Sequence, residues 1–214
     1  MKNKGRITFA GVSGLSAVLL IILVRFADVR PIGPEGTSIG LSHLNQSIFE
    51  CFGVNMLWYE ITDWLGIAPI LTAFGFAMAG LAQLIKRRSL LKVDREILVL
   101  GGLYIAVTGL YVLFELAVVN YRPVIMPGSV HPEASFPSSH TMLVCVIMGS
   151  AGMLIGRYIR GKTLRRVLRI MCAVIIGITI IGRLISGVHW FTDILGGIFL
   201  SAALLTLFSE VKNG

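Results

Sequence analysis

Long apolar segments occur six times in this 214-residue chain, and they constrain its fold more than any other feature. Each has about the 20 residues that a helix needs to cross the hydrocarbon core of a bilayer. The segments are 7–24, 64–85, 97–114, 134–156, 170–188 and 190–209. The sequence therefore predicts an all-α integral membrane bundle of six transmembrane helices.

The composition favours a bilayer over water as the surroundings of this chain. Hydrophobic residues make up 55% of it and charged residues 14%, whereas soluble domains carry about 25% charged residues. The net charge of +8 does not indicate nucleic-acid binding, because the cations lie in short runs between apolar segments. The three cysteines lack paired spacing and predict neither a disulfide nor a zinc site. The first apolar run has no small-residue cleavage site, so we expect a retained helix rather than a signal peptide.

The distribution of Lys and Arg predicts the orientation in the membrane, since cytoplasmic loops are enriched in both. Threading the chain with a cytoplasmic N-terminus places 15 of the 19 cations on that side. We therefore expect a multi-pass protein of the cell membrane with both chain ends in the cytoplasm. The same threading places the loop 120–139 and the turn 186–189 on the outer side. Residues 38–63 mix apolar and polar side chains, which suggests an interfacial helix between the first two spans, or a plain loop.

Two arginines and a serine on the predicted outer side form a candidate anion site. Arg122 follows the third span, Ser138 lies at the start of the fourth, and Arg183 lies near the end of the fifth. Arginine has a planar fork of donors that matches phosphate oxygens. Ser138 and backbone N–H groups at a helix N-terminus can add neutral donors to the same anion, although Ser138 can equally cap the helix.

Two histidines and a carboxylate complete the candidate site. His189 and Asp193 are four residues apart, so on one helix they share a face. Asp193 can then accept from one ring nitrogen and leave the other nitrogen nucleophilic. His140 is the candidate proton donor to a leaving oxygen. Phosphoryl transfer is the chemistry that this set of side chains suits.

The chain resembles the type 2 phosphatidic acid phosphatase superfamily, whose motifs are Lys-x6-Arg-Pro, Pro-Ser-Gly-His and Ser-Arg-x5-His-x3-Asp. Here the motifs read Glu115-x6-Arg122-Pro123, Pro137-Ser138-Ser139-His140 and Gly182-Arg183-x5-His189-x3-Asp193. The motif region is thus 115–193 within a single domain, 1–214. Three positions depart from the family pattern: Glu115, Ser139 and Gly182.

Carried over by position, the resemblance implies that His189 attacks phosphorus to form a phosphohistidine and that Asp193 orients its ring. It implies that His140 protonates the leaving group. The groups that would hold the phosphoryl oxygens are Arg122, Arg183, Ser138 and the backbone of Ser139. Family members dephosphorylate lipid phosphates or pyrophosphates without a metal, so we expect no cofactor. The expected partners are a phosphorylated lipid and the membrane, and not nucleic acid.

Glu115 replaces the motif lysine and reverses its charge. A charge pair at about 4 Å is worth about 4 kcal/mol at an effective dielectric near 20, so the exchange of Lys for Glu beside phosphate costs roughly twice that. Glu115 precedes Arg122 by seven residues, two helical turns, and is expected to face the site and modulate it. The leading hypothesis is an outer-face lipid phosphate or prenyl pyrophosphate phosphatase. The alternatives are a catalytically weakened or silent relative that binds or transports a lipid phosphate, and a lipid phosphotransferase.

Overall fold

Six helical stretches in the computed structural model are long and apolar enough to cross a membrane, within residues 2–213, which the structure describes. They are α1 (Lys2–Phe26), α3 with α4 (Met56–Leu65 and Ile67–Arg87), α5 (Arg95–Leu116), α6 (Ser139–Tyr158), α7 (Lys162–Ile185) and α8 (Phe191–Asn213). No β-strand forms in the described residues. The six-span, all-α prediction is confirmed, and the chain is a multi-pass membrane protein.

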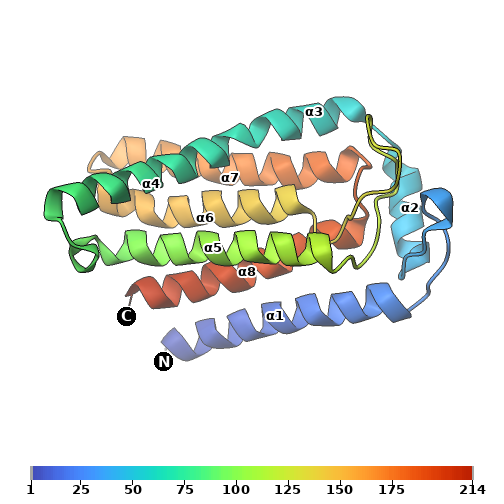
Figure 1. Ribbon diagram of the computed structural model, residues 1–214, viewed down its shortest axis with the longest axis horizontal. Coiled ribbons are helices and arrows are strands. Elements are labelled where there is room, and N and C mark those ends of the chain that lie inside the picture. Colours follow the sequence, from blue (N-terminus) through green and yellow to red (C-terminus); the bar gives the residue numbers. More distant parts are fainter. Residues whose placement is uncertain (1, 214) are drawn as a thin grey trace.

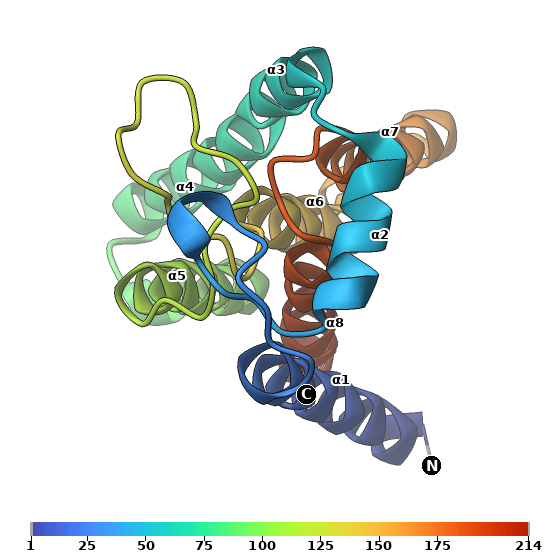
Figure 2. The ribbon, with the colours of Figure 1, turned by 90° about the vertical axis from the view of Figure 1, so that its right-hand side faces the viewer.

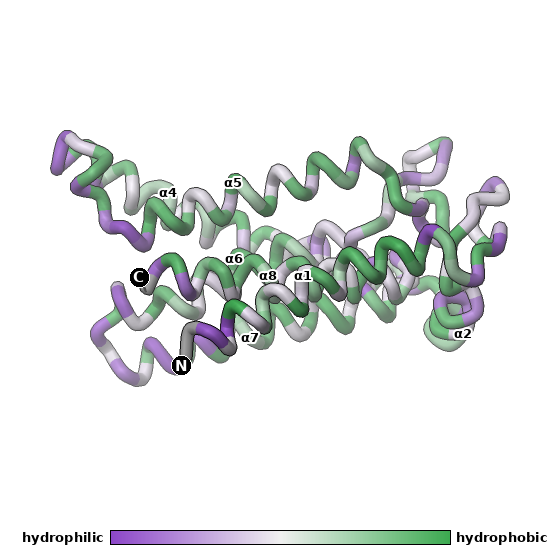
Figure 3. The backbone as a smooth tube through the Cα atoms, turned by 90° about the horizontal axis from the view of Figure 1, so that it is seen from below, coloured by the Kyte–Doolittle hydropathy of each residue, from purple (hydrophilic) through white to green (hydrophobic). Residues whose placement is uncertain are grey.

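Helix α6 is the centre of the bundle, with α4, α5, α7 and α8 in contact with it (Figures 1 and 2). Its buried side chains Met142, Val146 and Leu154 pack with Leu100 of α5 and Phe208 of α8 in the main hydrophobic cluster. Large apolar side chains remain exposed on the outer helices, which is the arrangement expected where acyl chains surround a bundle. Figure 3 shows this apolar middle between two hydrophilic ends.

The segment between the first two spans differs from the single interfacial helix expected over 38–63. Helix α2 (Ser42–Phe52) lies across one end of the bundle (Figure 2), as an interfacial helix does. The following helix α3 instead meets α4 at Gly66 and extends the second span to Met56–Arg87. The polar residues of α3 hid this extension from the sequence, although Thr62 is buried against α7 and Asp63 bonds Arg183 of that helix.

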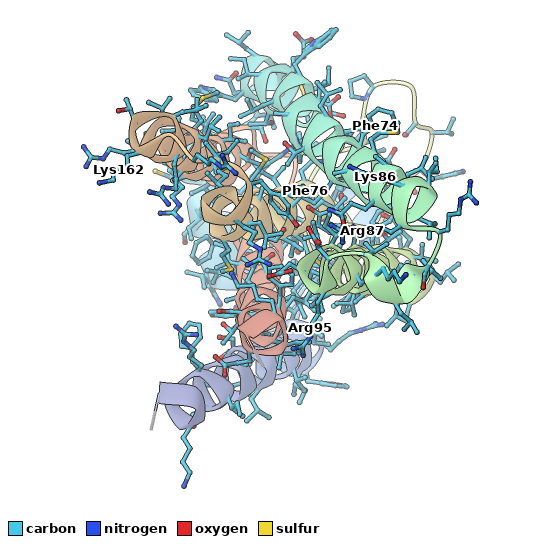
Figure 4. The ribbon with its side chains drawn as sticks, turned by 90° about the vertical axis from the view of Figure 1, so that its left-hand side faces the viewer. Phe74, Phe76, Lys86, Arg87, Arg95 and Lys162 are labelled. Carbon is cyan, nitrogen blue, oxygen red and sulfur yellow. The ribbon has the colours of Figure 1, made fainter. Side chains whose placement is uncertain are left out.

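The start of α6 also differs from the expected span 134–156. The helix begins at Ser139, because Pro137 precedes it and Ser138 is its N-cap residue. Residues 117–138 form an irregular loop at the same end of the bundle as α2 (Figure 1). At the other end, basic side chains such as Lys86, Arg87, Arg95 and Lys162 surround the loops that join α4 to α5 and α6 to α7 (Figure 4).

Candidate active site

The loop 117–138 folds back on itself and brings the first and second motifs together. Tyr121 and Ala134 form an isolated antiparallel bridge. Arg122 N donates to Glu133 O over 3.0 Å, and Ser135 N donates to Asn120 O over 3.1 Å. Because of this pairing, side chains fifteen residues apart in the chain, those of Asn120 and Ser135, meet at one place.

The turn between α7 and α8 carries the third motif and depends on a glycine. Gly187 has a φ of +65°, and a Cβ on it would lie 2.0 Å from Gly53 O. The link between α2 and α3 therefore packs directly on this turn, and Asn55 N donates to Ser186 O over 3.0 Å. Only glycine combines this φ with so close a backbone approach.

His189 and Asp193 form the centre of the candidate site, with Ser135 between them. His189 Nδ1 lies 3.8 Å from Asp193 Oδ2, which is too far for a direct hydrogen bond. Ser135 Oγ lies 3.1 Å from that Nδ1 and donates to Asp193 Oδ2 over 2.5 Å. Ser135 therefore accepts from Nδ1–H, which leaves the lone pair on His189 Nε2. That nitrogen lies 3.3 Å from Arg122 Nη1, a donor, which agrees with this tautomer.

Asp193 is fully buried and has hydrogen bonds to both of its oxygens. Asn120 Nδ2 donates to Oδ1 over 2.8 Å, and Trp190 N donates to Oδ2 over 2.9 Å. These donors satisfy the acceptors of a carboxylate that has no access to water. Sequence reasoning missed Asn120 and Ser135, since neither belongs to a spaced motif.

The imidazole of His189 is held neutral by its surroundings. Burial lowers the pKa of His189 to about 4, and the positive charges of Arg122 and Arg183 act in the same direction against the opposing Asp193. A neutral ring at neutral pH has the free lone pair that a nucleophile needs.

Arg183 presents donors that the protein does not use. Its side chain is 0% exposed, and its guanidinium lies over the Tyr59 ring, with Cζ 4.8 Å from the centroid. Nη2 donates to Asp63 Oδ1 over 3.2 Å. Nε and Nη1 are buried without a hydrogen-bond partner in the described part of the chain. Buried cationic donors that lack a partner are suited to an anion.

The second motif divides its residues between two roles. The Ser138 side chain accepts from Thr141 N and Thr141 Oγ1, over 3.4 and 3.0 Å, so it caps α6 and does not line the pocket. Ser139 lines the narrow pocket that also contains Arg122 and His189. His140 faces a neighbouring cavity, and its Nε2 lies 3.0 Å from Asp63 Oδ1.

Glu115, in the last turn of α5, lines the same narrow pocket as Arg122, Ser139 and His189. Its carboxylate has no cation within ion-pair distance among the residues that the structure describes. Glu115 therefore faces the candidate site, as the spacing from Arg122 predicted, and its carboxylate lies in the same pocket as Arg122 and His189.

Comparison with known proteins identifies the fold and finds a family match for the second half of the chain. The structure is similar to the crystal structure of the first transmembrane PAP2 type phosphatidylglycerolphosphate phosphatase from Bacillus subtilis, with a TM-score of 0.68. The match covers 94% of each chain at 17% sequence identity, so it shows a shared fold. No curated protein matches the sequence. The PAP2 superfamily model matches residues 116–213. This match contains Arg122 and the whole of the second and third motifs, and it begins one residue after Glu115.

Gly182, where the PAP2 motif has serine, admits α3 to the site. A Cβ on Gly182 would lie 2.4 Å from Thr62 Cγ2 and 3.0 Å from Trp58 Cε3. Helix α3 therefore packs against α7 more closely than any other residue at this position would permit. The close packing brings Tyr59 and Asp63, both from α3, to Arg183.

Restoring the serine of the PAP2 motif should destabilise this protein. We expect Gly182→Ser to lower the stability by about 1–3 kcal/mol, because the new Cβ overlaps Thr62 Cγ2. Thr62→Ser removes that methyl group and keeps the hydroxyl that bonds Trp58 O and Tyr59 O. The double variant should regain most of the thermal unfolding temperature of the purified protein. Equal unfolding temperatures for wild type and Gly182→Ser would show that α3 is not held by this contact.

Proposed function

We propose that this protein is a PAP2 phosphatase that cleaves a phosphorylated lipid through a phosphohistidine at His189, on the outer face of the cell membrane. The observation that carries the proposal is the distance of 3.3 Å between His189 Nε2 and Arg122 Nη1, in a narrow pocket beside an apolar cavity. This arrangement combines a nucleophile, an anion-binding cation and space for a lipid.

The apolar cavity supports a lipid substrate. It has a volume of about 500 Å³ and lies between α4 and α6, where Ile67, Ile70, Leu143 and Ile147 line it. Asp63, Ser139 and His140 lie at its polar end, and Ser139 also lines the narrow pocket. An acyl or prenyl chain in this cavity would therefore bring its headgroup to both histidines.

The proposed reaction has two steps. His189 Nε2 attacks phosphorus, the bond from phosphorus to the leaving oxygen breaks, and His140 gives that oxygen a proton. A water molecule then attacks the phosphohistidine, gives its proton to His140, and frees His189 and inorganic phosphate. Arg122 and Arg183 hold the phosphoryl oxygens throughout, and Asp193 keeps the His189 ring in place through Ser135.

Phosphate release from a panel of lipids by the purified protein tests this proposal. The Bacillus subtilis structure is that of a phosphatidylglycerolphosphate phosphatase, so a phosphorylated glycerolipid is the first substrate to measure and a prenyl diphosphate the second. We expect release from at least one of them. Release from neither, by protein that unfolds cooperatively, would contradict the proposal.

A second candidate function follows from Glu115. An unpaired carboxylate in the pocket opposes a phosphate dianion, which favours a relative that binds or moves a lipid phosphate without cleaving it. Binding of a lipid phosphate without phosphate release would identify this case. Transfer of the phosphoryl group to an acceptor other than water would identify a phosphotransferase instead.

The orientation can be tested with single cysteines in a variant without Cys51, Cys145 and Cys172. Val130, 78% exposed in the loop 117–138, and Leu91, 94% exposed between α4 and α5, lie at opposite ends of the bundle. We expect an impermeant thiol reagent on intact cells to label Val130→Cys and not Leu91→Cys, because basic residues surround Leu91. Labelling of Leu91→Cys alone would place the site on the cytoplasmic side.

A further inference from the structure

Asp63, which no PAP2 motif contains, lies between two of the groups that the proposed reaction uses. Its Oδ1 lies 3.0 Å from His140 Nε2 and accepts from Arg183 Nη2 over 3.2 Å. Asp63 also lines the polar end of the apolar cavity, next to His140. Its carboxylate is thus beside the path from a lipid tail to the phosphate pocket.

The position of Asp63 is fixed by the packing of α3. Thr62, the preceding residue, is fully buried against the Gly182 notch in α7. Tyr59, one turn earlier, stacks on the Arg183 guanidinium. Asn55, at the N-cap of α3, anchors that end through Ser186 O. Three contacts therefore hold the helix that presents Asp63, so its meeting with His140 follows from the fold.

The pair of His140 and Asp63 repeats the arrangement of His189 and Asp193. In each pair a carboxylate is near one ring nitrogen, and the other nitrogen is left for chemistry. For His140 the engaged nitrogen is Nε2, which leaves Nδ1. The two histidines need different charges for these roles. His140 must be cationic to donate a proton, and His189 must be neutral to act as a nucleophile.

Without Asp63, the surroundings of His140 would disfavour its cationic form. Burial and the positive charges of Arg183 and Arg122 disfavour a cation on the His140 ring, whereas the Asp63 carboxylate that faces the ring favours it. A third positive charge beside two arginines needs a nearby anion. Asp63 supplies that anion at hydrogen-bond distance.

We infer that Asp63 is a positioning residue, which orients His140 and stabilises it as the proton donor to the leaving oxygen. The inference rests on the proposed phosphatase function. When the bond between phosphorus and the leaving oxygen breaks, its electron pair stays on that oxygen. The His140 imidazolium transfers its proton there and becomes neutral, while Asp63 stays hydrogen-bonded to Arg183.

Dependence on the leaving group tests this role. A long-chain alkyl phosphate needs a proton on its departing oxygen, whereas a nitrophenyl phosphate leaves as a stable anion without one. We expect Asp63→Asn to lower kcat/KM about 30-fold for the alkyl phosphate and less than about 3-fold for the nitrophenyl phosphate. The larger loss is a part of the rate enhancement that a positioned proton donor provides. Asp63→Asn should cost little more when added to His140→Ala, since both act on one proton transfer. Glu60→Gln is the matched control, because Glu60 is an exposed carboxylate of the same helix.

Other results would overturn the inference in distinguishable ways. Equal losses for the two leaving groups would mean that Asp63 acts only on structure or phosphate binding. A gain in activity with tighter inhibition by vanadate would mean that Asp63 competes with phosphate for Arg183. Wild-type protein that cleaves neither substrate would refute the proposed function and this inference together, whereas an active wild type leaves the function standing.

Discussion

His189→Ala should lower kcat/KM for lipid phosphate cleavage by at least about 10⁴-fold, since it removes the atom that bonds to phosphorus. The reason is structural as well as chemical. His189 Nε2 is the histidine nitrogen that faces Arg122, and its burial keeps the ring neutral. Phosphate release and acid-labile labelling of the protein by a radioactive substrate should both be lost.

Two further variants separate catalysis from general damage. Asp193→Asn should lower kcat/KM less than His189→Ala does, because the amide keeps the shape of the side chain. It should still lower kcat/KM, because the charge that accepts from Ser135 and Trp190 N is lost. His131→Ala is the matched control, because His131 is an exposed histidine of the loop 117–138 that pairs with Glu35 at the surface. Full activity in a folded His189→Ala protein would refute the phosphohistidine mechanism.

A charge series at Glu115 should raise activity, by about 10-fold for Glu115→Gln and about 100-fold for Glu115→Lys. Glu115 lines the pocket with Arg122 and His189 and has no cationic partner among the described residues, so its charge acts against phosphate. The Gln variant removes the negative charge, and the Lys variant adds the donor that the PAP2 motif has. Inhibition by vanadate should tighten in the same order.

The measurement is kcat/KM for wild type and both variants with one lipid phosphate, at low and at physiological salt. A fall in kcat/KM at Glu115→Gln would show that the carboxyl group has a positive role, such as recognition of a hydrogen-bond donor on the substrate. Glu96→Gln is a suitable control, since Glu96 lies at the opposite end of α5 and pairs with Arg157.

Much of the fold could be predicted because spans have a strong local signal. Each of the six apolar runs corresponds to a helix that is long enough to cross the bilayer. The sequence did not reveal that α3 extends the second span. The polar residues of α3, Thr62 and Asp63, are typical of an interfacial segment. Their contacts with Gly182 and Arg183 of α7 become visible only in the structure.

The candidate site was predictable where chemistry and spacing coincide, as in His189 with Asp193. It was not predictable where residues act through tertiary pairing. Asn120 and Ser135 meet because the loop 117–138 folds back, and Asp63 reaches Arg183 because Gly182 has no side chain. Neither condition leaves a periodic pattern in the sequence. For Ser138 the motif predicted phosphate binding, whereas the side chain caps α6 by accepting from Thr141 N.

The contact between α1 and α8 has a consequence for biosynthesis. These two helices, the first and the last of the six described spans, lie side by side along the bundle (Figure 1), with Arg6 and Glu210 paired at 3.2 Å. Asp193 belongs to that last helix. A nascent chain that has inserted only five spans therefore still lacks Asp193, the carboxylate that we propose orients His189. Under the proposed mechanism, such a chain gains its reactivity toward phosphate only when the sixth span has joined the other five.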